Sequence, residues 1–423
     1  VVAMSTRRGR PRQVPASSGP AQRPGSASRR ALVGLSLLGL GAMGAVWAVT
    51  PHPFLPAPSG PYLVGTTVVE VRDPSRREVF APGDRPRVLP TQIWYPAAAR
   101  SDRPEPYVRD PHVFDGLLDL VHAPRALAAA WGRLPSHATA GAPAAPGRFP
   151  VIIISQGNLG YRQSQTVQVE ELVSHGYVVV SLDQPGTVGS ALLSDGTRIP
   201  YRGSSLVKPL VDQSIEPQQT PPELDGARFP QGLAPYLAAD PRAVLDWLST
   251  PSNPVRASMD LDRVGAMGMS LGGYTSSQWC TTDARVKACL LMDAPMTQDA
   301  LARGFSVPAL WLTRPASDMA AEGWPPTEVR HFDQTQRAAY RASRAPAWYV
   351  TVDGLFHADL TDAPYGAPGL SWLGMTSKNA GPEVHEIMRR LTVDFFDRAL
   401  QGSTDPSSLD RSPWPRVHVE SHP

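Results

Sequence analysis

Continuous apolar runs recur along this chain from residue 66 onward, each bounded by glycine, proline or polar residues. Runs that stay apolar at successive positions, without alternation, are typical of strands buried on both faces of a parallel sheet. We predict strands in the segments TTVVEV, TQIWYP, FPVIIIS, GYVVVSLD, DRVGAMG, VKACLLMD, VPALWLT and AWYVTVD. This pattern restricts the chain to folds that are built around a central sheet.

Helical segments alternate with these strands. Four candidates lie at 165–175, 236–249, 271–283 and 297–303. A last one, at 382–400, gathers its apolar residues on one face, as a helix packed on the sheet would: Val384, Ile387, Met388, Leu391 and Phe395. Strands that alternate with such helices predict βαβ units with right-handed crossovers. We therefore expect an α/β fold with a mostly parallel, doubly wound sheet and helices on both faces.

The first 50 residues differ from the rest. Residues 1–27 are rich in proline and arginine, and we expect a disordered basic tail there. Residues 28–50 begin with SRRALV and continue as 19 uncharged residues at 31–49. This pattern resembles a twin-arginine export signal and is also long enough for an N-terminal membrane anchor. Both alternatives predict an extracytoplasmic domain, either secreted or periplasmic, or attached to the membrane through 31–49.

The charge balance of the chain bears on its partners. Seven of the 40 basic residues lie in the first 30 positions, which hold no acidic residue, so the remainder carries 33 basic against 38 acidic side chains. That balance gives no electrostatic reason to expect nucleic-acid binding. The chain also lacks zinc-site spacing and a phosphate-binding loop, so we expect neither a metal nor a cofactor.

The chain has two cysteines, Cys280 and Cys289. An oxidising compartment would allow a bridge, but nothing about a separation of nine residues requires one. We expect two separate, buried, small apolar side chains.

The segment VGAMGMSLGGYT holds Ser270 between two glycines at the spacing G-x-S-x-G. A glycine-rich chain can produce this spacing by chance, so its surroundings matter. The motif falls between a predicted strand and a predicted helix, where small flanking residues allow a sharp turn that exposes the serine oxygen. That context predicts an α/β-hydrolase fold with Ser270 as nucleophile.

In such a fold the base follows the serine along the chain. Five histidines qualify by position, and His357 alone comes directly after the last strand, in YVTVDGLFHADLTD. A loop at that place can carry an imidazole over the edge of the sheet to the serine. We therefore predict His357 as the general base.

Two carboxylates could orient this histidine. Asp293 ends the strand KACLLMD, and Asp318 follows the next strand, VPALWLT. Spacing alone does not separate them. Asp318 could instead be an exposed loop acid or a helix cap, and Asp293 could cap a helix that begins near Met296.

An oxyanion hole needs backbone N–H groups beside the nucleophile. One should come from Leu271. The other should come from the turn SQGNLGYR after the VIIIS strand, where Gly157 permits close approach and Asn158 or Leu159 would present its amide.

Taken in order, several segments resemble the plasma-type (isoform II) platelet-activating factor acetylhydrolases and their bacterial esterase relatives. They are LPTQIWYPA, SQGNLGYRQS, LVSHGYVVVSLDQPGT, LDLDRVGAMGMSLGGYTSSQ, ARVKACLLMDAP, FHADLTD and FFDRALQG. The resemblance spans 62–402, the expected catalytic domain, and leaves 403–423 as a C-terminal tail.

This resemblance implies a calcium-independent serine ester hydrolase with Ser270 as nucleophile, His357 as base and Asp293 as acid. It also implies an oxyanion hole formed by the amides of Asn158 and Leu271. Substrates in this group are short or oxidised acyl esters of glycerophospholipids, or other small and polymeric carboxylic esters. The chain departs from the common pattern at Gln156, Met269 and Gln184.

Two long excursions, 112–134 and 186–232, interrupt the strand and helix pattern, and loops of such length tend to shape a binding site. The apolar stretch from Leu117 to Trp131, with Trp372 and Leu373, would form either a lipid-facing rim or ordinary core. We expect a serine carboxylic ester hydrolase that acts on a small ester or a phospholipid. The alternatives are an acyltransferase with the same triad and a catalytically silent, membrane-tethered binding protein on a hydrolase scaffold.

Overall fold

The structure is a computed structural model of the 423-residue chain, and it describes residues 55–423 except 121, 123, 126–127, 132–133, 367 and 373. The expected basic tail at 1–27 and the apolar segment at 28–50 therefore lie outside the described residues. Among the helices that are described, none combines the length and the apolar composition needed to cross a bilayer.

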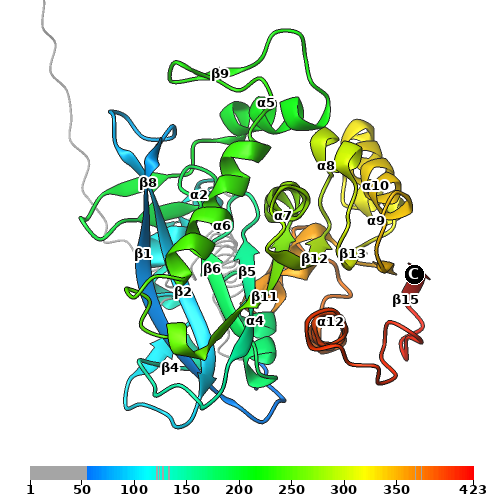
Figure 1. Cartoon of the computed structure of the whole chain (residues 1–423). Coiled ribbons are helices and arrows are strands. Elements are labelled where there is room, and N and C mark those ends of the chain that lie inside the picture. Colours follow the sequence, from blue (N-terminus) through cyan, green and yellow to red (C-terminus); the bar gives the residue numbers. More distant parts are fainter. Residues whose placement is uncertain are drawn as a thin grey trace, which may run out of the picture. The chain divides into compact units, whose positions relative to one another are not determined.

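Within the described residues, one sheet of 11 strands forms the centre of the domain (Figure 1). Its strands are β1 (Leu63–Arg77), β2 (Pro86–Ala97), β3 (Pro104–Pro106), β4 (Pro135–Ala140), β5 (Phe149–Ser155), β6 (Val178–Leu182), β11 (Met259–Met269), β12 (Val286–Met292), β13 (Ala309–Thr313), β14 (Ala347–Val352) and β15 (Val417–His422). Their order is β15-β14-β13-β12-β11-β5-β6-β2-β1-β4-β3. The run from β14 to β6 is parallel, whereas β2 is antiparallel to both β6 and β1. The mostly parallel sheet and all eight predicted strands are confirmed.

Helices cover both faces of this sheet, as predicted. They are α2 (Asp115–Leu120), α3 (Ala128–Trp131), α4 (Thr166–Ser174), α5 (Ser204–Ile215), α6 (Ala234–Leu248), α7 (Leu271–Thr282), α8 (Gln298–Arg303), α9 (Ala316–Ala321), α10 (Pro326–Arg341), α11 (Ala363–Gly366) and α12 (Pro382–Phe396). Short 3-10 turns occupy 111–114, 256–258, 357–360 and 368–371, and one π turn occupies 397–401.

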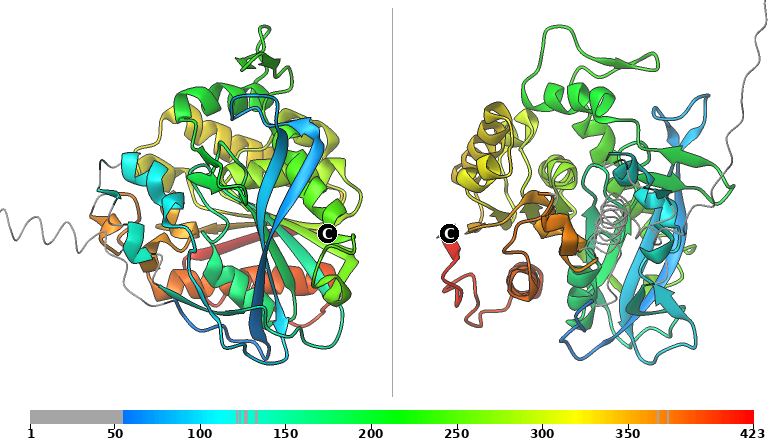
Figure 2. Two further views of the ribbon diagram at one scale, coloured as in Figure 1. Left: turned by 90° about the vertical axis from the view of Figure 1, so that its left-hand side faces the viewer. Right: turned by 180° about the vertical axis from the view of Figure 1, so that it is seen from behind.

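Alternate residues of the central strands supply two separate hydrophobic cores. In β5, Val151 and Ile153 join a core with apolar residues of α6, α7 and α10, and Ile152 and Ile154 join another with α4 and α12. Figure 2 shows these helices on opposite sides of the sheet. Because both faces are covered, the central strands must be apolar at every position, and this is the pattern that made them predictable.

The prediction of a C-terminal tail at 403–423 is wrong over its last part. β15 pairs antiparallel with β14 from Val417 opposite Val352 to His422 opposite Ala347. An edge strand with one solvated face alternates apolar and polar residues, so VHVESH lacks the continuous apolar run of the central strands.

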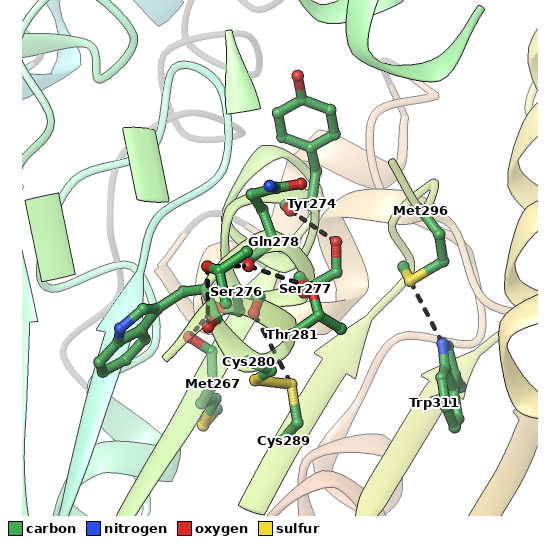
Figure 3. Close-up of a disulfide and its surroundings, with 12 residues drawn as sticks. Met267, Tyr274, Ser276, Ser277, Gln278, Cys280, Thr281, Cys289, Met296 and Trp311 are labelled. Carbon is green, nitrogen blue, oxygen red and sulfur yellow. Dashed lines mark hydrogen bonds between the residues drawn. A yellow bond between two sulfur atoms is a disulfide. The ribbon is translucent and has the colours of Figure 1, made fainter. Parts of the chain in front are cut away.

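The prediction of two separate cysteines is also wrong. Cys280 on α7 and Cys289 on β12 form a disulfide, with their Cα atoms 6.3 Å apart (Figure 3). Both residues are buried, as expected. The chain reverses direction after α7, and β12 runs back along that helix. Cys280 near the end of the helix therefore comes to lie next to Cys289 in the strand.

Both excursions contain secondary structure within the described residues. The first, at 112–134, contains α2 and α3. The second, at 186–232, contains α5 and two short hairpins, β7 (Ser190–Leu192) with β8 (Arg198–Pro200) and β9 (Glu223–Leu224) with β10 (Ala227–Arg228).

Candidate active site

Ser270 lies at a sharp turn between β11 and α7, with φ 56° and ψ −123°. The close contacts of this turn require the flanking glycines. A Cβ on Gly272 would lie 1.9 Å from the carbonyl oxygen of Ser155, and one on Gly268 would lie 2.2 Å from that of Gly272. The Ser270 N–H donates to the carbonyl of Met292, which ties the turn to the end of β12 (2.8 Å). The predicted strand, turn and helix are therefore present around Ser270.

Asp293 follows β12 directly, and its carboxylate meets the ring of His357. The distance between His357 Nδ1 and Asp293 Oδ2 is 2.7 Å. His357 begins the 3-10 turn that follows β14, and its side chain stays partly exposed, whereas Asp293 is fully buried. These two residues were predicted separately, and the edge of the parallel sheet brings them together.

Asp318 lies elsewhere, in the first turn of α9. Its Oδ2 accepts a hydrogen bond from the backbone N–H of Gly354, 2.6 Å away, at the start of the loop that carries His357. No hydrogen bond joins Asp318 to His357 in the described part of the chain. Asp318 thus steadies the loop and does not contact the imidazole.

Arg314 and Glu322 extend the contact between Asp293 and His357 into a network of charged side chains. The sequence did not predict these two residues. Arg314 Nε donates to Asp293 Oδ2 at 2.7 Å, and its Nη1 lies 2.5 Å from Glu322 Oε2. Glu322 also accepts the backbone N–H of His357 at 3.0 Å. The histidine is therefore held through both its ring and its main chain. Arg314 comes one residue after β13, and the carboxyl ends of parallel strands meet at one edge of the sheet. That position could have indicated that Arg314 lies near Asp293.

Burial by itself would raise the pKa of Asp293, but its neighbours outweigh that effect. The positive charge of Arg314 and the hydrogen bonds from His357 and Arg314 hold the pKa of this carboxyl well below its usual range. Thr313 Oγ1 donates a further hydrogen bond to Oδ1 (2.8 Å). Asp293 is therefore ionised and can keep the Nδ1 of His357 protonated, which leaves Nε2 free to accept a proton.

Aromatic rings surround the imidazole. Trp324 lies edge-on to His357 with ring centroids 5.0 Å apart, and Phe332 lies 6.2 Å away. The guanidinium of Arg314 sits 4.8 Å from the centre of the Trp324 ring. No sequence pattern pointed to these two aromatic residues, because they lie in a polar segment that follows α9.

The two amides expected to form the oxyanion hole belong to the first residue of α7 and to the turn after β5. Leu271 is the first residue of α7, so its N–H has no partner within the helix. The N–H of Asn158 has no acceptor among the described residues, whereas that of Leu159 donates to the carbonyl of Thr187 at 2.8 Å. A Cβ on Gly157 would lie 3.4 Å from that of Ser270, so this turn passes close to the serine. Of the two amides considered after Gly157, Asn158 remains free.

Two pockets open on Ser270. The larger, of about 470 Å³, also contains His357. It is lined by residues of the first excursion, of the segment 156–165 and of the segment 358–375, and its apolar side chains include Phe114, Leu117, Leu118, Leu370 and Met375. The smaller, of about 330 Å³, lies beside Leu271 and Tyr274 and is lined by α5 and α10. Both excursions therefore line the site, as predicted.

No hydrogen bond joins Ser270 Oγ to His357 in the described residues, although both line the larger pocket. In sites without substrate this contact is often long and shortens when substrate binds.

The apolar stretch from Leu117 to Trp131, with Trp372 and Leu373, was expected to form either a lipid-facing rim or ordinary core. Leu118 is buried, whereas Leu120 and Trp372 are 62% and 68% exposed. Leu373 lies outside the described residues, as does the side chain of Trp131. Burial and exposure thus both occur within the proposed rim.

Each of the three departures from the family pattern has a defined place. Gln156 and Met269 line the larger pocket, and Gln156 Nε2 donates to Ser181 Oγ at 2.8 Å. Gln184 lies away from the site and donates to the buried carboxylate of Asp240 at 2.8 Å. Over the described ranges, no three His, Cys, Asp or Glu side chains come together as ligands for a metal ion.

The strand order, the turn at Ser270 and the helices on both faces define an α/β-hydrolase fold. Among solved structures, the chain is similar to the ferulic acid esterase from Streptomyces cinnamoneus, with a TM-score of 0.68 and 24% identity over 86% of this chain and 98% of that chain. No protein-family model matches the chain, and no curated protein sequence matches it. This similarity shows the fold of the chain.

Proposed function

We propose that this protein is a serine carboxylic ester hydrolase with Ser270 as nucleophile, His357 as general base and Asp293 as the acid that orients it. The observation that carries the proposal is the contact between Asp293 and His357 beside a pocket that also contains Ser270 at a strained strand-to-helix turn. A strained serine turn, a paired imidazole and free amides beside the serine are the components that acyl transfer requires.

The reaction proceeds in two steps. His357 Nε2 takes the hydroxyl proton as Ser270 Oγ attacks the ester carbonyl carbon, and the backbone N–H groups of Asn158 and Leu271 donate to the resulting oxyanion. The bond to the alcohol then breaks, and the imidazolium gives its proton to the departing oxygen. Water, deprotonated by the same nitrogen, then attacks the acyl carbon. The bond to Ser270 Oγ breaks, the imidazolium returns the proton to that oxygen, and the carboxylic acid is released.

For substrates, we propose small carboxylic esters, including short or oxidised acyl esters such as those of the platelet-activating factor type. Two features support an ester of this size. The pockets beside Ser270 are of about 330 and 470 Å³, and the similar solved structure is that of a ferulic acid esterase.

We also propose that the domain acts outside the cytoplasm, secreted or periplasmic, or attached to the membrane through 31–49. The disulfide between Cys280 and Cys289 supports this, since such bonds persist mainly in oxidising compartments.

A fluorophosphonate probe and p-nitrophenyl acetate together test the proposal. The wild-type protein should be labelled at Ser270 and should hydrolyse the ester. Ser270→Ala should lose labelling and lower kcat by about 10⁴-fold or more. The control is Ser249→Ala, at an exposed serine beyond α6, which should behave as wild type. Near-full turnover by Ser270→Ala would disprove the assignment.

A further inference from the structure

The two pockets meet at Ser270 but differ in their walls, and this difference allows the halves of the ester to be assigned. Building on the proposed function, we propose that the smaller pocket binds the acyl group and the larger one the alcohol, and that the preferred acyl group has an apolar body with an uncharged hydroxyl at its far end.

The position of His357 decides which half of the ester lies where. The departing alcohol oxygen must come within hydrogen-bond reach of the imidazole, because that ring returns the proton. His357 lines the larger pocket and does not line the smaller one. The alcohol therefore extends into the larger pocket, and the acyl group must lie on the other side of the serine. Asn158 lines both pockets, as expected for an oxyanion donor between the two halves.

The innermost lining residues of the smaller pocket are buried and mainly apolar. Tyr274 is fully buried, and Val207 and Leu271 are 2% and 6% exposed. Trp324 and Phe332 contribute aromatic walls. A hydrocarbon or aromatic body next to the carbonyl would be desolvated here without loss of hydrogen bonds.

The rim of the same pocket is charged and reaches solvent. Lys208 Nζ on α5 lies 2.9 Å from Asp212 and 3.7 Å from Glu328 on α10. His331 on α10 pairs with Glu216, just beyond α5, at 2.8 Å. The contacts of Lys208 with Glu328 and of Glu216 with His331 join α5 and the residue that follows it to α10.

Carboxylates outnumber cationic groups at this rim. Asp212 and Glu328 line the pocket together with Lys208 and His331, and a third carboxylate, that of Glu216, contacts His331 from just outside the lining. A hydroxyl can donate to such carboxylates, whereas an acyl chain that ends in a carboxylate would be repelled. The rim therefore favours a neutral, hydrogen-bonding end over a charged one.

Three ethyl esters that share one alcohol test the acyl end: the hexanoate, the 6-hydroxyhexanoate and the half-ester of adipic acid. We expect kcat/KM for the hydroxy ester to exceed that for the hexanoate by about 2- to 10-fold, the value of one hydrogen bond. The half-ester should be the poorest of the three. Equal rates for all three, or preference for the half-ester, would overturn the choice of acyl end. Glu328→Gln combined with Asp212→Asn should raise the half-ester rate relative to the hexanoate.

Two pocket variants test the assignment of the halves. Val211→Trp, in the smaller pocket, should lower kcat/KM for hexanoyl relative to acetyl esters by about tenfold. Leu118→Trp, in the larger pocket, should instead lower the rate for large relative to small alcohols. Val211→Phe is a smaller change to use if the tryptophan disrupts folding, and fluorophosphonate labelling measures the folded fraction of each variant. The size-matched control is Leu192→Trp, at a 39% exposed residue that lines neither pocket.

The opposite pattern, with Val211→Trp acting on the alcohol and Leu118→Trp on the acyl group, would overturn the assignment, as would no change in either ratio. In either case, the proposed function would stand as long as the probe labels the protein and the protein hydrolyses esters. An unlabelled wild-type protein that hydrolyses no ester would overturn the proposed function itself.

Discussion

The carboxylate of Asp293 stays ionised in a place from which water is excluded. Arg314 on one side and the Nδ1–H of His357 on the other stabilise its negative charge, and Thr313 donates to its second oxygen. Since an ionised acceptor holds an imidazole in one tautomer and one orientation, this single buried group would determine which nitrogen of His357 takes the proton in the proposed reaction.

A comparison of two aspartates tests this at the level of single residues. Asp293→Asn should lower kcat by about 10⁴-fold, because an amide can favour the wrong tautomer of His357. Asp318→Asn should change kcat far less, because Asp318 contacts only the backbone of the loop. Steady-state rates with p-nitrophenyl acetate measure both. If the larger loss follows Asp318→Asn, the acid has been assigned to the wrong residue.

At the scale of secondary-structure elements, the helix after the serine and the strand that precedes the acid are joined covalently. The disulfide links α7 to β12 within the core, close to hydrogen bonds such as that from Ser276 Oγ to Met267 (Figure 3). Ser270 precedes this helix and Asp293 follows this strand, so the link connects the two elements that carry the proposed nucleophile and acid.

Removal of this disulfide should cost stability. The loop it closes is short, so Cys280→Ala combined with Cys289→Ala should lower the free energy of unfolding by about 2–3 kcal/mol. Denaturant unfolding under oxidising conditions gives the value. Wild-type protein unfolded with a reductant should match the double variant, and a reductant should not affect the double variant. An unchanged unfolding midpoint would mean that the disulfide adds nothing.

A second link between elements is a buried ion-pair network. Arg87 on β2 forms two hydrogen bonds to Asp240 on α6, at 3.1 and 2.7 Å, and lies 2.6 Å from Glu78. Arg87→Met should destabilise the domain by about 3–5 kcal/mol, because two buried carboxylates lose a partner. Arg285→Met is the control, since that side chain is 44% exposed and its ion pairs should contribute about 1 kcal/mol or less. Equal midpoints of thermal unfolding for the two variants would show that the buried network of Arg87 stabilises the domain no more than an exposed ion pair does.

At the scale of the whole domain, the packing of helices on the sheet also buries a histidine. His385 on α12 is 4% exposed, and its ring centroid lies 3.7 Å from that of Tyr365. Burial, assisted by the charge of Arg389, lowers the pKa of His385 from 6.5 to about 3. The folded protein therefore holds this imidazole neutral where the unfolded chain would protonate it.

This difference makes the stability of the domain depend on pH. Between pH 6.5 and 3 the unfolded chain binds one more proton at His385 than the folded protein does. The contribution of the buried neutral imidazole to the free energy of unfolding is therefore complete above pH 6.5 and is lost as the pH falls toward 3. Relative to His385→Phe, the wild-type protein should lose about 1.4 kcal/mol per pH unit between pH 6 and 4. Unfolding measured at several pH values tests this, with the exposed His418→Phe as control. Parallel pH curves for wild type and His385→Phe would exclude the effect.

Patterns that depend on neighbours in sequence were enough to predict the central strands, the helices between them and the turn at Ser270. A strand buried on both faces must be apolar throughout, and a serine turn needs glycines where the backbone passes within contact distance. The position of His357 at this edge of the sheet was also predictable, because it is the histidine that directly follows the last parallel strand.

Other features depend on how the elements pack together. The edge strand β15 has no continuous apolar run, and the disulfide depends on how the crossover after α7 returns along the sheet. Arg314 and Glu322 have roles only because they meet Asp293 and His357 in space.

The order of strands and helices and the residue types at their ends follow from local patterns, because burial and backbone geometry act on each segment separately. Which aspartate meets His357, and how the space beside Ser270 divides into an apolar pocket and one with a charged rim, was decided by the tertiary structure. The reason is physical: hydrogen bonds and pocket walls need positions accurate to less than 1 Å, and long-range packing alone sets those positions.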